Sequence, residues 1–181
     1  MSARVLVCFA HPAPRHSRVH VSLAEAARGV AGVTVHDLYD AYPELDIDIE
    51  AEQRRLLAHE VLVIQCPMYW YSVPPLVKQW FDLVLEHGWA YGRQGTALAG
   101  KRAALAISAG GRQQAYGPEG NNRYTFEEFL RPVEATMRLC RMTWCAPFIV
   151  AGTHAMTAGD IAEAAGRYAA WLADLAQAGG A

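Results

Sequence analysis

The sequence predicts an α/β fold: a doubly wound, five-stranded parallel sheet of order 2-1-3-4-5 with helices on both of its faces. Two observations support this prediction. Short, largely apolar runs alternate with segments of helical periodicity along the whole chain. Runs without polar alternation are typical of parallel strands that helices cover on both sides. With 181 residues, the chain is expected to form a single domain, residues 1–181.

Each element is placed by its local pattern. The strands are expected at five apolar runs, 4–10, 33–38, 61–66, 103–108 and 144–150. The fourth run is rich in Ala, which has a low strand propensity, so its place in the alternation is what makes it a strand. The helices are expected over 17–28, 49–59, 74–86, 124–139 and 157–176.

Composition and charge argue against several classes of function. With a net charge of −2, the chain lacks the basic excess that nucleic-acid binding requires. No apolar run approaches the roughly 20 residues of a membrane span, and the N-terminus has no signal-peptide pattern. We therefore expect a cytoplasmic protein.

The cysteines are not expected to hold a metal. Three of the four lie in apolar, strand-like runs, so buried and reduced thiols are expected. Neither their spacing nor a second Cys or His pair indicates a zinc site. The four residues are Cys8, Cys66, Cys140 and Cys145.

The predicted topology indicates where a ligand would bind. In open α/β sheets, ligands lie beyond the carboxyl ends of the strands, at the point where the strand order reverses. Here this point falls between the first and third strands, with the fourth alongside. The loops that matter are therefore 10–16, 67–73 and 109–116.

The first loop predicts an anion-binding helix N-terminus. Ser17 stands where an N-cap belongs, and the next turn would offer free N–H groups to a phosphate, beside His11, His16, Arg15 and Arg18. Neither a Walker-type loop nor a G-x-G-x-x-G fingerprint is present. A capped helix with surface histidines is the alternative interpretation.

The second loop is unusual because it carries a large, flat apolar surface where small polar residues are the norm. Met68, Tyr69, Trp70 and Tyr71 follow Pro67, and two more prolines come after them. These side chains would form a wall for a planar ring, held by a backbone that the prolines restrict. Packing into the core or a subunit interface is the alternative.

The third loop has paired glycines, Gly110 and Gly111, directly after the fourth strand. Glycine permits unusual dihedral angles and lets a ligand approach the backbone closely. Two N–H groups there would face an electron-rich ring edge, although a simple flexible turn is the alternative. A phosphate-binding helix N-terminus, a flat aromatic wall and the paired glycines Gly110 and Gly111, here called the glycine ledge, together predict a site for FMN, with FAD as the alternative flavin.

The chain also resembles the flavodoxin-like NAD(P)H:quinone oxidoreductases, and within them the ancillary quinone reductase subunits of bacterial glutathione-gated potassium efflux systems. The resemblance covers residues from about 5 to 171. It rests on five ordered motifs: H-P-x-P-x-x-S from His11, D-I-D-I-x-A-E-Q from Asp46, P-M-x-W-Y-S-V-P-P from Pro67, H-G-W-A-Y-G from His87, and the later G-G pair.

This resemblance implies a flavodoxin-like fold, a homodimer and FMN-dependent two-electron chemistry. In ping-pong order, NAD(P)H would give a hydride to flavin N5 and leave, and a quinone or similar electrophile would then be reduced in its place. The positions that match the family's cofactor site are His11, Ser17, Arg18, Val19 and His20 for the phosphate and ribityl end, Pro67, Met68, Tyr69, Trp70 and Tyr71 along the ring, and Ser108, Ala109, Gly110 and Gly111 at its pyrimidine edge.

The resemblance also implies a catalytic tyrosine, Tyr116, which would stabilise the reduced flavin. Two positions depart from the family pattern. Asn122 replaces a histidine found in some relatives, and because an amide cannot carry a proton, a Tyr–His relay is not expected here. His20 replaces an asparagine common in the ancillary subunits.

Two other functions are compatible with the sequence. The first is a regulatory subunit that binds a potassium/proton antiporter and so sits at the inner face of the cell membrane. The second is a one-electron flavodoxin-type carrier. Such carriers are usually strongly acidic so as to meet basic partners, which the net charge of −2 does not match.

Two further motifs have structural roles. Gly88 is expected to end the helix 74–86 as its left-handed cap, while Trp89 and Tyr91 of the same motif would line the pocket or the dimer partner's site. The acidic stretch 46–50 is expected to cap the helix that follows it, since carboxylates are favourable at a helix N-terminus.

Overall fold

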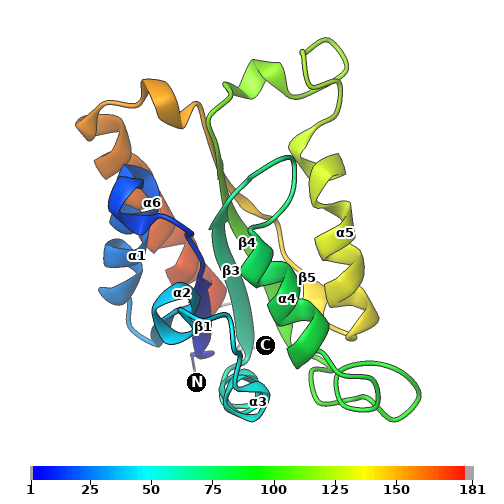
Figure 1. Ribbon diagram of the computed structural model, residues 1–181. Helices are drawn as coiled ribbons and strands as arrows, with labels where there is room; N and C mark the ends of the chain where they lie inside the picture. Colours follow the sequence, from blue (N-terminus) through cyan, green and yellow to red (C-terminus); the bar gives the residue numbers. More distant parts are fainter. Residues whose placement is uncertain (1, 178–181) are drawn as a thin grey trace.

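The computed structural model describes residues 2–177 and shows a parallel sheet between two layers of helices (Figure 1). The strand order β2-β1-β3-β4-β5 confirms the predicted topology, and every strand pair is parallel. The strands are β1 (Val5–Phe9), β2 (Val33–Asp37), β3 (Val61–Pro67), β4 (Arg102–Ala109), β5 (Thr143–Trp144) and β6 (Phe148–Ala151).

Helices cover both faces of the sheet. In Figure 1, α1 and α6 lie on one side, and α3, α4 and α5 lie on the other. The α-helices are α1 (Arg18–Arg28), α2 (Leu38–Ala41), α3 (Ile49–Leu57), α4 (Pro75–Val84), α5 (Phe126–Leu139) and α6 (Ala158–Gln177). Short 3-10 turns, which the sequence analysis did not predict, follow β1, β4 and β6: η1 (Pro14–His16), η2 (Gln113–Ala115) and η3 (Thr153–Ala155).

Alternate strand residues build two separate cores. In β1, Val5 and Val7 pack with α1 and α6, whereas Leu6 and Cys8 pack on the side of α3, α4 and α5. Successive side chains of a strand point to opposite faces, so a strand buried on both sides must be apolar throughout. This is why the strands lack the polar alternation of a half-exposed sheet.

The predicted fifth strand, 144–150, is divided in two. β5 and β6 both pair with β4, through Ala103 opposite Trp144 and Ala106 opposite Phe148. Residues 145–147 therefore lie opposite residues 104 and 105, which is one residue more than a regular ladder holds. Pro147 lies in this interruption and has no N–H to donate to a ladder.

The helix caps agree with the sequence in one case and differ in another. Asp48 caps α3, and its side chain accepts the Ala51 N–H at 2.9 Å. The prediction for Gly88 was wrong: α4 ends at Val84, and Gly88, at φ +84°, closes a separate turn by donating to the Tyr91 carbonyl at 2.8 Å.

The cysteines are reduced, and most are buried. Cys8, Cys66 and Cys140 lie in the core, whereas Cys145 is only half-buried, at the interruption between β5 and β6. Within residues 2–177, no group of His, Cys, Asp or Glu side chains is arranged to hold a metal ion. None of the helices described is both long and apolar enough to span a bilayer.

A buried carboxylate, Glu52, joins four parts of the fold. It is fully buried on α3 and accepts hydrogen bonds from His36 Nε2 at 2.8 Å, the Tyr42 hydroxyl at 2.7 Å and Trp80 Nε1 at 2.9 Å. Burial alone would raise the pKa of Glu52, but these hydrogen bonds outweigh it and the pKa lies below its usual value. Glu52 therefore stays ionised and holds β2, the end of α2, α3 and α4 together.

We predict that Glu52→Ala lowers the free energy of unfolding by roughly 3–5 kcal/mol at pH 7, because three buried donors lose their acceptor. Urea denaturation would measure the loss. The control is Glu50→Ala, an exposed residue of the same helix, for which a change within about 0.5 kcal/mol is expected.

The difference in stability between the wild type and Glu52→Ala should depend on pH. Because the pKa of Glu52 is lowered in the folded state, its contribution is present at neutral pH and is lost as the pH falls through the folded pKa. The stability of wild type and Glu52→Ala should therefore converge in acid. Equal losses of unfolding free energy in Glu52→Ala and in the control Glu50→Ala at pH 7 would contradict this account of the buried carboxylate.

Candidate functional site

The register of the strands brings the three predicted loops to one edge of the sheet. Where β1 ends, the Ala10 N–H donates to the Gln65 carbonyl at 2.8 Å. Where β3 ends, Pro67 lies opposite Ser108, and the Met68 N–H donates to the Ser108 carbonyl at 2.7 Å. The loops after β1, β3 and β4 therefore leave the sheet side by side, as the topology predicted.

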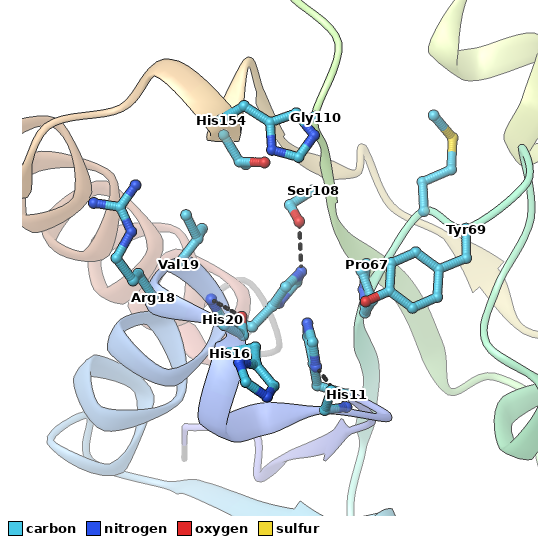
Figure 2. A pocket seen from close by; sticks show the side chains of 14 residues that line it. His11, His16, Arg18, Val19, His20, Pro67, Tyr69, Ser108, Gly110 and His154 are labelled. Carbon is cyan, nitrogen blue, oxygen red and sulfur yellow. Dashed lines mark hydrogen bonds between the residues drawn. The ribbon is translucent and has the colours of Figure 1, made fainter.

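A first cavity of about 400 Å³ lies between these loops and the start of α1 (Figure 2). Its lining contains imidazole, guanidinium and hydroxyl groups but no carboxylate. This donor set suits an anion. The lining residues are His11, Ala13, His16, Ser17, Arg18, Val19, His20, Pro67, Met68, Tyr69, Ser108, Gly110, Thr153 and His154.

The N-terminus of α1 opens into this cavity. Ser17 is the N-cap, and its Oγ accepts the His20 N–H at 3.1 Å. The first turn of a helix leaves further N–H groups without intrahelical partners and carries the positive end of the helix dipole. Arg18, exposed at the same turn, adds a fixed positive charge.

Two histidines in the cavity are held neutral. His11 Nδ1 accepts the Ala13 N–H at 3.1 Å, which leaves its Nε2–H as a donor, and burial lowers its pKa. Burial lowers the pKa of His20 further, to about 3, and the neighbouring His11 adds to the effect. His20 Nε2 lies 2.8 Å from Ser108 Oγ (Figure 2).

The second loop forms a tight turn with an unusual backbone. The Tyr69 N–H donates to the Ser72 carbonyl at 2.9 Å, and the Ser72 N–H donates back at 3.0 Å. Between them, Trp70 and Tyr71 have φ values of +49° and +62°. This sign of φ at both central residues defines a type I′ turn, which normally contains Asn or Gly. Trp70 is 94% exposed at its tip.

A second cavity, of about 610 Å³, adjoins the first. It shares Met68 and Tyr69 with the first cavity and is lined mainly by flat or apolar groups rather than cations. Its lining residues are Met68, Tyr69, Trp70, Tyr71, Gly111, Tyr116 and Asn122.

Two aromatic side chains organise the outer wall of this second cavity. The Tyr71 hydroxyl donates to Asn122 Oδ1 at 3.1 Å, which joins the second loop to the third. Tyr116 stacks on Phe126 with ring centroids 3.9 Å apart. Burial and the nearby Tyr71 raise the pKa of Tyr116, so its hydroxyl keeps its proton. Asn122 therefore bonds to Tyr71 of the second loop. Among the residues that the structure describes, no hydrogen bond joins the Asn122 side chain to Tyr116.

The glycine pair is explained by close approach rather than by backbone angles. A Cβ on Gly110 would overlap the His154 ring, and a Cβ on Gly111 would lie 3.2 Å from the Tyr116 hydroxyl. Neither glycine has a positive φ, so the expected unusual dihedral angles are absent at this pair. Because both glycines lack a side chain, the rings of His154 and Tyr116 can lie close to the backbone of the glycine ledge.

Almost all of the predicted site residues line one of these two cavities. The exceptions are Ala109, which is buried at the end of β4, and Arg15, which is exposed; both are absent from the two linings. Sequence analysis missed Thr153 and His154, which follow β6. Because β6 pairs with β4, the rule that selects loops after the carboxyl ends of strands would have found them.

Comparison with known proteins agrees with this architecture. A protein-family model for the flavodoxin-like fold matches residues 3–172 of this chain. The chain belongs to this flavodoxin-like family. Among its relatives is the glutathione-regulated potassium-efflux system ancillary protein KefG of Pectobacterium carotovorum subsp. carotovorum (strain PC1), 45% identical over 94% of this chain and 93% of that protein.

Solved structures similar to this chain extend the comparison. The general stress protein 14 of Treponema denticola, in complex with FMN, is 40% identical with a TM-score of 0.91, over 95% of this chain and 99% of that one. An NADPH-quinone reductase from P. pentosaceus is 28% identical with a TM-score of 0.84, over 93% and 96% of the two chains.

We predict that Trp70→Asn raises the free energy of unfolding by about 1 kcal/mol, because asparagine tolerates the left-handed backbone better than tryptophan does. The exposed indole loses little packing when it is removed. Thermal or urea unfolding would measure the gain. The control is Tyr124→Asn, an exposed aromatic without a positive φ, which should not gain stability. A loss of stability in Trp70→Asn would contradict the proposed strain.

Proposed function

We propose that this protein is an FMN-dependent NAD(P)H:quinone oxidoreductase. One observation carries the proposal: a cavity lined by hydrogen-bond donors and a cavity lined by aromatic groups share Met68 and Tyr69 and so adjoin each other. FMN has this same division, with a phosphate at one end and a planar ring at the other. When bound, FMN supplies the chemistry, accepting a hydride from reduced nicotinamide and passing two electrons to a quinone or similar electrophile.

The phosphate end of FMN fits the first cavity. Arg18 and the N–H groups at the start of α1 offer charge and hydrogen bonds to a dianion. His11 would donate through Nε2–H, since its Nδ1 already accepts from Ala13. Because no carboxylate lines the cavity, nothing there repels the phosphate.

The ring end fits the second cavity. Met68, Tyr69 and Trp70 would lie along the ring. The N–H group of Gly111, in the same lining, and that of Gly110, which lines the first cavity, would meet the polar edge of the ring, where negative charge develops on reduction. Tyr116 keeps its proton and lies against Gly111, so it would donate a hydrogen bond at the same edge.

The relatives support the same assignment. The Treponema denticola protein was solved in complex with FMN, and the protein from P. pentosaceus is an NADPH-quinone reductase. Together with the fit of the two cavities, this favours FMN over FAD and a two-electron reductase over a one-electron carrier.

We predict that the purified protein binds FMN and is yellow, that NADH or NADPH bleaches it, and that a quinone restores the colour. Visible absorption, followed by identification of the flavin released on denaturation, would measure this. In Gly110→Val the added side chain would fill the ledge against His154, and we expect the variant to fold but to lose FMN. A wild-type protein that no flavin colours would contradict the proposal.

We further predict that Tyr116→Phe slows the bleaching of bound FMN by NAD(P)H about 10- to 100-fold, the effect of losing one hydrogen bond to a developing charge. Stopped-flow absorption would measure the rate. Tyr124→Phe removes an exposed hydroxyl that lies in neither cavity lining and should leave the rate unchanged. A wild-type rate in Tyr116→Phe would remove Tyr116 from the catalytic residues.

A second function is favoured by the comparison with KefG, a potassium-efflux system ancillary protein. We propose that this chain also binds a potassium/proton antiporter at the inner face of the cell membrane, and that it otherwise acts as a homodimer in the cytoplasm. Exposed aromatic groups at the ring cavity, Trp70 and Tyr71, are suited to cover by a second copy. Co-purification with the transporter from membranes would test the first part, and the mass of the protein in solution would test the second.

A further inference from the structure

Three buried polar side chains are linked next to the first cavity: His20 from α1 and Ser108 from β4, which line it, and Gln65 from β3, which contacts His20 from behind the lining. The amide Nε2 of Gln65 donates to the His20 backbone carbonyl at 2.9 Å and lies 3.5 Å from His20 Nδ1. On the far side of the ring, His20 Nε2 lies 2.8 Å from Ser108 Oγ.

The chemistry of this chain of groups fixes its hydrogens. A backbone carbonyl only accepts, so the Gln65 amide must present its nitrogen to His20, although this leaves Gln65 Oε1 buried without a partner. The other amide hydrogen then faces His20 Nδ1, which has to be the unprotonated nitrogen of the ring. His20 therefore carries its proton on Nε2 and donates it to Ser108 Oγ.

The tautomer of His20 sets the role of the Ser108 hydroxyl. A hydroxyl that accepts one hydrogen bond keeps its own hydrogen free, and Ser108 lines the first cavity beside Arg18 and His16. Because His20 fills one of the two Oγ lone pairs and takes no hydrogen from Ser108, the hydroxyl hydrogen is left to point toward a ligand. Ser108 can thereby act as a donor in the cavity, which is what an oxygen-rich, negatively charged ligand requires.

We propose that His20 is a positioning residue: held by Gln65 as its Nε2–H tautomer, it fixes the Ser108 hydroxyl as a donor to an oxygen of the ribityl phosphate chain of FMN. This rests on the proposed function, and it gives Gln65 and Ser108 distinct tasks. His20 does not act as a cation here. It is buried, its pKa is about 3, and the titratable side chain that faces it is His11, with ring centroids 5.7 Å apart.

A double-mutant cycle on FMN affinity would test the coupling. Ser108→Ala and His20→Leu should each weaken FMN binding about 10- to 100-fold, as expected for one hydrogen bond to a charged group. If His20 acts through Ser108, the double variant should bind no more than about threefold weaker than Ser108→Ala. Multiplied losses would overturn the proposal. His59→Gln, on the surface away from both cavities, should bind as wild type.

Nitrogen-15 NMR of the flavin-free wild-type protein tests the tautomer without FMN and without a variant that might unfold. We expect His20 to show a protonated Nε2 and an unprotonated Nδ1, with no change between pH 8 and pH 4.5. An Nδ1–H tautomer, or protonation near the usual histidine pKa of about 6.5, would overturn the proposal.

The two experiments separate the failure of this inference from that of the proposed function. A wild-type protein that binds no FMN contradicts the function and, with it, the role assigned to Ser108, whatever the NMR spectrum shows. A protein that binds FMN normally but shows the Nδ1–H tautomer, or multiplied losses in the cycle, contradicts the positioning role alone.

Discussion

The hydrogen-bonded register of β3 with β1 and β4 is the constraint on which the site depends. It sets Pro67 opposite Ser108 and ties the Ala10 N–H to the Gln65 carbonyl, so that three loops leave the sheet at the same level. A shift of one residue would turn every side chain of a strand to the other face. The two apolar cores therefore maintain the register, and the register in turn places His20 against Ser108 and the glycine ledge beside the tight turn.

Within that frame, the two halves of the site are prepared in different ways. The first cavity, where we propose that the phosphate binds, has fixed donors: a helix N-terminus, a guanidinium and neutral histidines whose hydrogens are set by Ala13 and Gln65. The ring half relies on backbone strain, with Trp70 and Tyr71 held in left-handed conformations by the hydrogen bonds between Tyr69 and Ser72. Strain of this kind is retained where the surrounding structure imposes it, often at ligand sites.

The sheet order and most of the site were predictable because strand–helix alternation and the carboxyl-end rule depend only on local patterns. What the sequence could not indicate were features set by tertiary contacts. Glu52 lies on a polar helix, and only packing shows that it is buried. The segment 144–150 was predicted as one strand because it is apolar almost throughout, although Pro147 interrupts it. His154 was missed because the loop after β6 was not considered, although the same rule applies to it.

The central claim is that one continuous site recognises both a phosphate and a planar ring. The most direct test is to compare the Kd of the flavin-free protein for FMN and for riboflavin, which has the same ring but no phosphate, by quenching of flavin fluorescence. The account predicts that FMN binds about 100-fold more tightly or better, because charge-assisted hydrogen bonds at the start of α1 hold the phosphate. Equal affinities for the two flavins would contradict it.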